Sequence, residues 1–133
     1  MYYKNAIDEC VQVEDIYQID IVPDIVTIGK SAIPNLQTGW FSKQTTYPAA
    51  VFYLLGSLVR NYISNTAQTV NFTYYFEVRA FTEPERDNLA RNLCSVLSTI
   101  YESRRTQYDD SFESATGTYI KRITFTFTVK LGV

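Results

Sequence analysis

The sequence predicts an α+β fold: a mostly antiparallel sheet with a long β-hairpin, one main helix packed on a sheet face, and a C-terminal strand. Three stretches support this. Apolar residues recur at helical spacing from Thr82 to Tyr101, and they alternate with polar residues from Val70 to Ala80 and from Tyr119 to Leu131. A helix with one apolar face must cover that face, and each alternating run offers an apolar face for it. A chain of 133 residues has the length of a single domain.

The predicted helix carries its own start signal. The Thr82 hydroxyl can accept a hydrogen bond from the first turn, Glu85 occupies the matching capping-box position, and Pro84 falls where its missing N–H does no harm. The apolar face consists of Leu89, Leu93, Val96, Leu97 and Ile100. The opposite face consists of Arg86, Asn88, Arg91, Asn92, Ser95 and Thr99. We expect the apolar face to be structural.

A β-hairpin is predicted before this helix. An apolar run starts at Pro48, Gly56 indicates a bulge, and the run continues to Ile63. A polar triplet supplies the turn: Ser64, Asn65 and Thr66. The returning strand has an apolar face of Val70, Phe72, Tyr74, Phe76, Val78 and Ala80, and a second face of Asn71, Thr73, Tyr75, Glu77 and Arg79.

The terminal strand alternates in the same way. Its apolar face is Ile123, Phe125, Phe127, Val129 and Leu131, and its polar face is Arg122, Thr124, Thr126, Thr128 and Lys130. The segment between helix and strand, residues 102–117, is polar and mixed in charge. Its charged residues include Arg104, Arg105, Asp109, Asp110 and Glu113. We therefore expect a polar loop there.

The N-terminal part allows two interpretations. A helix would use Ala6, Cys10, Val13 and Tyr17, whereas a strand would use Val11, Val13, Tyr17, Ile19 and Ile21. We favour a strand after about residue 10, because valine and isoleucine dominate the apolar set and Pro23 interrupts a continuing helix. A second short apolar run, from Ile25 to Ile28, ends at Gly29.

A long loop is predicted over residues 29–46, which contain two glycines, Pro34 and several small polar residues. Loops of this length in small domains are often functional. Trp40 and Phe41 are its natural anchors. They fit packing against the core and contact with a partner equally well.

Composition narrows the function classes. The formal net charge of −2 gives no cationic field for gathering phosphates, so tight binding of nucleic acid is disfavoured. The two cysteines, Cys10 and Cys94, have no CxxC spacing, and we expect both to be small core residues rather than a disulfide. The first residues lack the apolar core of a secretory signal, no apolar run has the length of a membrane span, and no membrane partner is expected.

No pattern of catalytic residues stands out. The chain has no histidine, which removes the commonest general base and metal ligand. The carboxylate pairs fit solvated surface charge better than a cation or acid–base site: Asp8 with Glu9, Glu14 with Asp15, and Asp109 with Asp110. Ser57 lacks the glycine pattern of a nucleophile elbow, and there is no Gly-rich phosphate loop. We expect no enzyme, no cofactor and no bound metal.

Two further groups of residues suggest contacts. Arg104 and Arg105 have tyrosines nearby for stacking on nucleic acid, but cations near a helix end also complement its dipole, and the following aspartates offset their charge. Tyr75 and Tyr119, predicted to be exposed, suit a sheet face that meets another subunit as well as they suit a solvated face.

The order of segments in the chain is similar to that of a known family. YPAAVFYLLG is followed by a polar turn, VNFTYYFEVRAF, the predicted helix, a polar loop containing YDDSFESATGTY and a long terminal strand. This order resembles the tail terminator family of tailed phages, the lambda minor tail protein U type. The resemblance covers roughly residues 47–133. Residues 1–46 depart from the family, whose members usually begin with a helix.

The resemblance implies a structural virion protein. Tail terminators form hexameric rings at the head-proximal end of the tail, stop polymerisation of the tube, and provide the surface that docks to the head or neck. The implied partners are further copies of the chain, the tail tube protein, a neck or head-completion protein and, in a contractile tail, the sheath. DNA only passes through the lumen, and assembly takes place in the host cytoplasm.

By analogy, the candidate interface residues are Trp40, Phe41, Asn65, Tyr75, Arg86, Arg91, Arg104, Arg105, Asp109 and Asp110. Two alternatives remain. One is a related phage protein, from the neck, the head closure or the tail tube. The other is a small α+β enzyme or ligand-binding domain that uses a cavity between sheet and helix.

Overall fold

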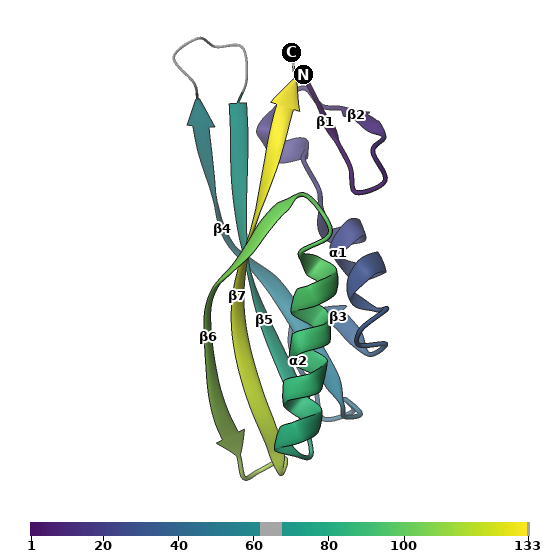
Figure 1. Cartoon of the computed structure of the whole chain (residues 1–133), viewed down its shortest axis with the longest axis vertical. Helices are drawn as coiled ribbons and strands as arrows, with labels where there is room; N and C mark the ends of the chain where they lie inside the picture. The colour runs from purple at the N-terminus through teal and green to yellow at the C-terminus, as the bar shows by residue number, and fades with distance from the viewer. Residues whose placement is uncertain (62–67, 133) are drawn as a thin grey trace.

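The computed structural model describes residues 1–61 and 68–132, which form one seven-stranded sheet and two α-helices (Figure 1). The strands are β1 (Tyr2–Lys4), β2 (Cys10–Gln12), β3 (Leu36–Thr38), β4 (Ala49–Asn61), β5 (Gln68–Ala80), β6 (Glu102–Glu113) and β7 (Thr118–Gly132). The helices are α1 (Val22–Gly29), α2 (Glu83–Leu97) and a short 3-10 helix, η1 (Ile16–Gln18). The predicted α+β class is confirmed. Within the described residues, no helix has the length and apolarity needed to cross a membrane.

The centre of the sheet is the antiparallel pair β5 and β7, which are matched from Gln68 with Leu131 to Ala80 with Tyr119. β4 pairs with the other side of β5, and β3 runs parallel to the beginning of β4. On the far side of β7, β6 and β1 pair with different parts of the same edge. The sheet is long and strongly twisted, with the β4–β5 hairpin at one end and the β6–β7 hairpin at the other (Figure 1).

Both α-helices lie on one face of the sheet, the inner face, and the core fills the space between them. The inner-face side chains predicted for β5 and for β7 are buried. Phe52 stacks on Phe76, and Phe76 meets Phe125 edge-on. The buried stripe of α2 consists of Arg86, Ala90, Leu93 and Leu97. The predicted packing of this helix on a sheet face is therefore confirmed.

The α2 helix begins as predicted and ends earlier. The Thr82 hydroxyl accepts a hydrogen bond from the backbone N–H of Glu85, at 3.3 Å. At the other end, the hydroxyls of Ser98 and Thr99 donate to main-chain carbonyls of the last turn, which offers the backbone an alternative to continuing the helix. Tyr101 then has φ 53°, in the left-handed region, so it directs the chain away from the helix axis into β6.

The strand predicted after about residue 10 is confirmed only at β2, since residues 16–18 form η1 and the apolar run from Ile25 to Ile28 lies in the helix α1. Pro23 lies in the first turn, where a helix needs no N–H from it. Asp20 accepts from the N–H of Val22 just before that turn. Gly29, at the end of α1, packs against Leu36 so closely that a Cβ would collide with its side chain. The predicted loop over residues 29–46 contains β3.

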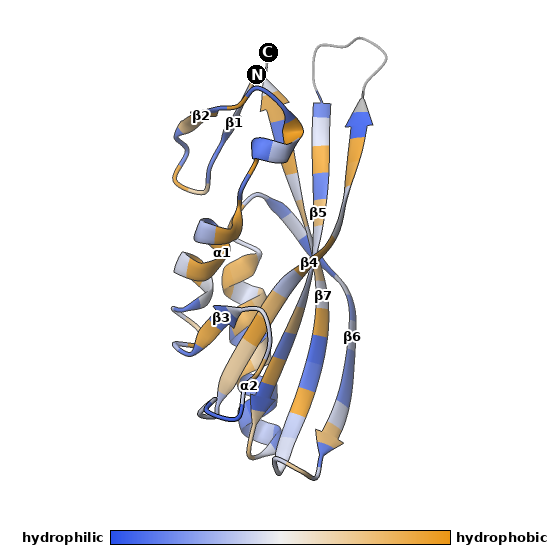
Figure 2. Cartoon of the chain, turned by 180° about the vertical axis from the view of Figure 1, so that it is seen from behind, coloured by the Kyte–Doolittle hydropathy of each residue, from blue (hydrophilic) through white to orange (hydrophobic). Residues whose placement is uncertain are grey.

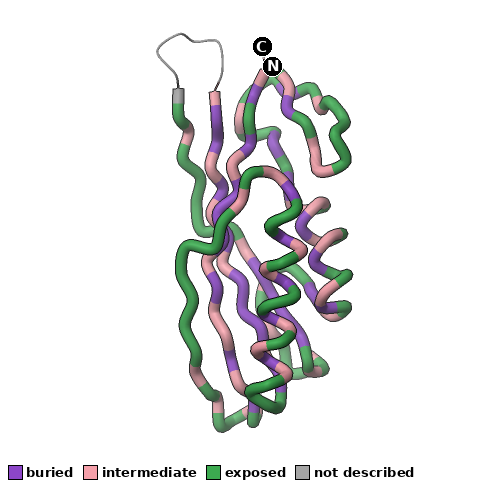
Figure 3. Tube along the Cα trace, viewed as in Figure 1, coloured by how far each residue is buried: buried purple, intermediate pink, exposed green. Residues whose placement is uncertain are grey.

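The predicted polar loop over residues 102–117 is also wrong over most of its length. Residues 102–113 form β6, an edge strand that pairs with β7 from Glu102 to Glu113. Most of its side chains are exposed (Figure 3), so its sequence carries no apolar alternation. Arg104 and Arg105 accordingly lie on a strand and not at the end of a helix.

Three smaller predictions can be compared with the structure. The register of β4 against β5 shifts between Leu54 and Gly56, which confirms the bulge. Cys94 is half-buried, but Cys10 is exposed, so the prediction that both are core residues fails for Cys10; both thiols are free. The predicted hairpin turn at Asn65 lies outside the described residues.

We predict that Leu93→Ala destabilises the protein by about 2 to 5 kcal/mol, because the Leu93 side chain is fully buried between α2 and the sheet. The measurement is the free energy of unfolding in urea. Asn92→Ala, on the exposed face of the same helix, is the control and should change stability by about 0.5 kcal/mol or less. Equal effects of the two changes would contradict the position of the buried stripe.

Candidate functional site

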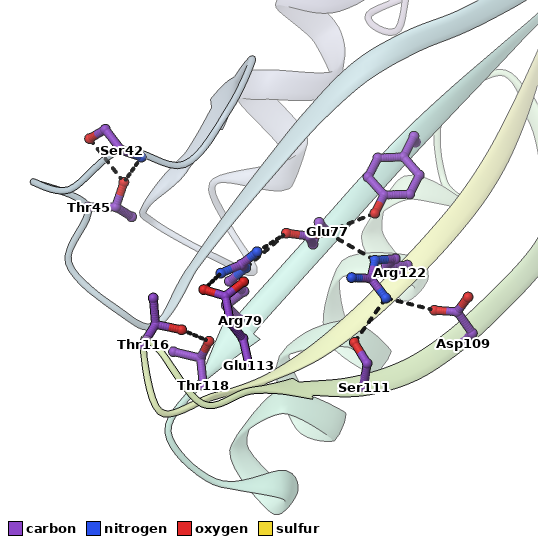
Figure 4. A network of polar contacts seen from close by, with 11 residues as sticks. Ser42, Thr45, Glu77, Arg79, Asp109, Ser111, Glu113, Thr116, Thr118 and Arg122 are labelled. Atoms are coloured by element: carbon purple, nitrogen blue, oxygen red, sulfur yellow. Dashed lines mark hydrogen bonds and ion pairs between the residues drawn. The ribbon is translucent and has the colours of Figure 1, made fainter.

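The outer face of the sheet, opposite the helices, carries a network of charged side chains around Glu77 (Figure 4). One carboxylate oxygen of Glu77 accepts from the Tyr75 hydroxyl at 2.8 Å and from Nε of Arg122 at 3.2 Å. The other accepts from Nε of Arg79 at 2.9 Å. Glu77 is only 8% exposed, and both of its carboxylate oxygens accept hydrogen bonds from other side chains of the protein.

The network ties three strands together. Arg79 also forms an ion pair with Glu113 of β6, at 3.1 Å. Arg122 of β7 donates to the Ser111 hydroxyl at 2.9 Å and lies 3.7 Å from a carboxylate oxygen of Asp109. Arg79 therefore connects Glu77 of its own strand with β6, and Arg122 connects β5 with β6, which stabilises the register of the three strands.

The charge states of the network favour structure over acid–base chemistry. Burial alone would lower the pKa of Arg79, but the hydrogen bonds and attraction from Glu77 and Glu113 outweigh it, and the net shift is upward. Burial, followed by the hydrogen bond to Glu77, raises the pKa of Tyr75. Both groups keep their protons at neutral pH, so neither is tuned to exchange one.

An aromatic group borders this network. The Trp40 ring lies 4.7 Å from that of Tyr53, and the Arg79 guanidinium lies 4.5 Å from the centre of the Phe41 ring. Together with Tyr75 and Glu77 they line a recess of about 300 Å³. Trp40 is 73% exposed, whereas Phe41 is half-buried. The accessible side chains of the recess are mainly aromatic rings, because its charged groups already bind one another.

A second recess, of about 280 Å³, lies between α2 and β6. Arg91 and Arg105 line it together with Tyr108 and Cys94. Arg105 stacks on the Tyr108 ring at 4.3 Å. Burial raises the pKa of the Cys94 thiol, which makes this cysteine a weak nucleophile.

Arg86 does not lie on the outer face of α2 as predicted. It is 5% exposed and forms ion pairs with Asp87, at 3.0 Å, and with Asp110 of β6, at 3.5 Å. Lys121 of β7 pairs with the same two aspartates. Arg86 therefore connects α2 to the β6–β7 hairpin by ion pairs, and it is too buried to be an exposed contact residue.

The two predicted exposed tyrosines are half-buried instead. Tyr75 is held by Glu77, and the Tyr119 ring packs against that of Phe112, at 4.8 Å. Threonines of β7 are likewise engaged with β5, since Thr126 bonds Thr73 and Thr128 donates to Asn71. The outer face of the sheet consequently offers few unpaired polar groups, whereas Tyr119 lies on the inner face, with the Arg86 guanidinium 5.9 Å from the centre of its ring.

The remaining predicted residues fall into separate places. Arg91 and Arg105 meet at the recess beside α2, and Arg104 lies on the opposite face of β6. Asp109 and Asp110 also point to opposite faces and pair with different cations. Within residues 1–61 and 68–132, no group of three or more Cys, Asp or Glu side chains is arranged to hold a metal ion.

An exposed apolar stretch that the sequence did not predict lies on β4. Leu54, Leu55 and Leu58 are 48%, 54% and 55% exposed, and all belong to the part of β4 beyond the helices, residues 53–61, which we call the β4 arm. In Figure 2 this part of β4 is apolar below its tip, and in Figure 3 it is largely exposed. The apolar run predicted a strand correctly, but nothing in it distinguished a buried strand from an exposed one.

The β4 arm borders a groove of about 540 Å³ on the inner face. Its walls include Phe52 and Leu54 of β4, Tyr74 of β5, and Tyr17 and Ile19 at η1. Burial, with a smaller effect of Asp20, raises the pKa of Tyr74 to about 12, so its hydroxyl stays neutral. The groove is therefore mostly aromatic and aliphatic.

Comparison of the sequence with models of known protein families and with curated proteins finds no match in either case.

We predict that Glu77→Gln lowers the free energy of unfolding by about 1 to 3 kcal/mol, because two arginines then face a neutral amide in a partly buried site. Glu102→Gln is the matched control. Glu102 is exposed and pairs with Lys130, so its loss should cost about 1 kcal/mol or less. Identical unfolding midpoints in the two variants would rule out Glu77 as the centre of the network.

We predict a pH-dependent role for Asp87. Hydrogen bonds from Arg86 and then Lys121 lower its pKa from the ordinary 3.8, so its contribution to stability is present above that pH and is lost as the pH falls through the lowered value. Wild-type protein and Asp87→Asn should differ in stability at neutral pH and converge in acid. The measurement is urea unfolding across this range. A constant difference would contradict the assignment.

Proposed function

We propose that this chain is a structural protein of a phage tail: a ring-forming tail terminator that caps the tail tube and provides the docking surface for the head or neck. The observation that carries the proposal is the β4 arm. Monomeric proteins seldom display adjacent exposed leucines on a projecting strand, and such patches typically mark contacts with other proteins.

The order of elements supports the same function. The hairpin β4–β5, the helix α2 and the closing strand β7 follow the order on which the resemblance to tail terminators rests, although the strand β6 stands where that order has a polar loop. That resemblance is an analogy at the level of pattern, so the function is argued from the surfaces as well.

The polar groups of the described residues also favour assembly over catalysis. Glu77 bonds Arg79 within β5 and Arg122 across to β7, and Asp110 is paired with Arg86 and Lys121. These side chains stabilise the sheet and leave no free pair of acid and base at the recesses described above. Their arrangement suits a rigid building block.

In the proposed ring, neighbouring copies meet through heterologous contacts, in which a different surface of each copy faces the next. Arg91 and Arg105 on one side of the chain, and Trp40 on the outer face, are the exposed candidates for these contacts. The β4 arm then faces the tail tube protein, and the opposite rim of the ring meets the neck or head-completion protein. A contractile tail would add the sheath.

The proposed ring lets DNA pass without binding it. The net charge of −2 provides no strong positive field in a lumen built from this chain. The proposed location is the head-proximal end of the virion tail. A neck, head-closure or tube protein would share these surfaces, and control of tube length is the property that distinguishes a terminator from them.

We predict that the purified protein forms a closed ring with six times the mass of one chain, and that adding it to growing tail tubes shortens them. Native mass spectrometry gives the mass, and electron microscopy of tubes gives the length distribution. Arg91→Glu should weaken the ring, whereas Lys30→Glu, which makes the same change of charge at the end of α1, should leave it intact.

A protein that stays monomeric at high concentration and leaves tube lengths unchanged would refute the terminator function. A ring that joins tubes to heads without limiting tube length would instead assign the chain to the neck.

A further inference from the structure

The β4 arm has an open backbone edge. One side of it pairs with β5 through to residue 61, with a single shift of register at the bulge. On the other side, β3 pairs with β4 only as far as Phe52, where the Gly39 N–H donates to the Phe52 carbonyl at 3.0 Å. Among the described residues, no backbone hydrogen bond reaches that side of the strand beyond Phe52.

This edge carries less charge than edge strands normally do, since Arg60 is the one charged residue between Tyr53 and Asn61, and the bulge at Leu54 and Gly56 interrupts only one end of it. The opposite edge of the sheet, β6, has charged side chains on both faces, including Arg104, Arg105, Asp109 and Asp110. Charges of this kind discourage pairing with another strand. The β4 arm instead shows Leu54, Leu55 and Leu58, so the same sheet has one protected edge and one edge suited to pairing.

The arm also presents apolar surface on both of its faces. Leu54 lies opposite Tyr74 on the inner face, above the groove, whereas Leu58 lies opposite Asn71 on the outer face. Beyond the bulge, residues 56–61 pair regularly with β5, a stretch of about 20 Å at the usual rise of a strand. An added strand that begins beside Leu54 and continues along this stretch would place its first inward-facing side chains at the groove and the following ones on the inner face of the arm.

We propose that the β4 arm binds an extended segment of another protein, with apolar side chains at alternate positions, as an additional strand of the sheet. Main-chain hydrogen bonds to the open edge provide the affinity. The groove beside Phe52 and Leu54 provides the specificity for apolar side chains. The β6 edge of a second copy does not fit, because its inner-face residues Arg105 and Asp110 would enter this apolar groove. The inference concerns the arm alone and does not require the chain to form a ring.

The test selects binders from a library of random displayed dodecapeptides on the full-length protein, with counter-selection on the variant Leu54→Lys/Leu58→Lys. Both leucines are exposed, so the variant should keep the wild-type unfolding curve, which is checked first. The expected result is enrichment of peptides that lack proline and carry β-branched or aromatic residues at alternate positions.

An enriched peptide is then made synthetically, and its affinity is measured by fluorescence anisotropy. We expect Leu54→Lys/Leu58→Lys to weaken binding by about tenfold or more. The matched control, Thr106→Lys/Gln107→Lys on the β6 edge, should leave it unchanged. N-methylation of alternate peptide residues should abolish binding when the methyl groups face β4, and should be tolerated when they face away, because only the first removes donors from the ladder.

Three results would overturn the proposal. The first is a selection that enriches no peptide. The second is peptide binding that does not depend on the position of N-methylation. The third is self-association of the wild-type protein, abolished by Leu54→Lys/Leu58→Lys, in the absence of any enriched peptide. The last result would assign the arm to a second copy of this chain.

Discussion

The antiparallel pairing of β5 with β7 is the contact on which the rest of the structure depends. It places Phe76 beside Phe125 on the inner face, where α2 packs, and it places Glu77 beside Arg122 on the outer face. The same register therefore creates both the apolar inner face on which the helices pack and the charged network on the outer face. A slip of one residue would exchange the two faces and lose both.

The two faces stabilise the sheet by different means. Burial of aromatic and aliphatic side chains drives the packing of the inner face. The outer face depends on charge-assisted hydrogen bonds between strands, in which Glu77 connects two arginines and each arginine reaches β6. Since those groups satisfy one another, the outer face exposes few unpaired charges, and its most exposed aromatic side chain is Trp40.

The sequence predicted those strands and helices in which apolar side chains are buried and polar side chains are exposed at regular spacing. Alternation identified β5 and β7, and helical spacing with a capping threonine located α2. The strand β6 has no apolar alternation, because its backbone makes the ladder while most of its side chains face solvent. The helix α1 was not predicted, because a proline can either interrupt a helix or begin one, and Pro23 begins this one. Local patterns carry little information on either point.

The candidate surfaces were harder to predict for a related reason. Helical spacing assigned Arg86 to the polar face, yet its position falls in line with Ala90, Leu93 and Leu97, and its guanidinium reaches carboxylates at the edge of the sheet. The leucines of the β4 arm resembled an ordinary core strand, since exposure depends on where the helices end. Arg91 and Arg105 lie near each other only because β6 returns alongside α2.

The length of the β5–β7 ladder also has a mechanical consequence. Hydrogen bonds between antiparallel strands are perpendicular to the strands, and these strands follow the long axis of the molecule (Figure 1). A force that pulls the Gly132 end of β7 away from the Ala80 end of β5 would load all of these bonds together in shear, whereas a force that peels one strand sideways would break them one after another. The ladder is therefore stiffest along the strands, which is also the direction of the β4 arm.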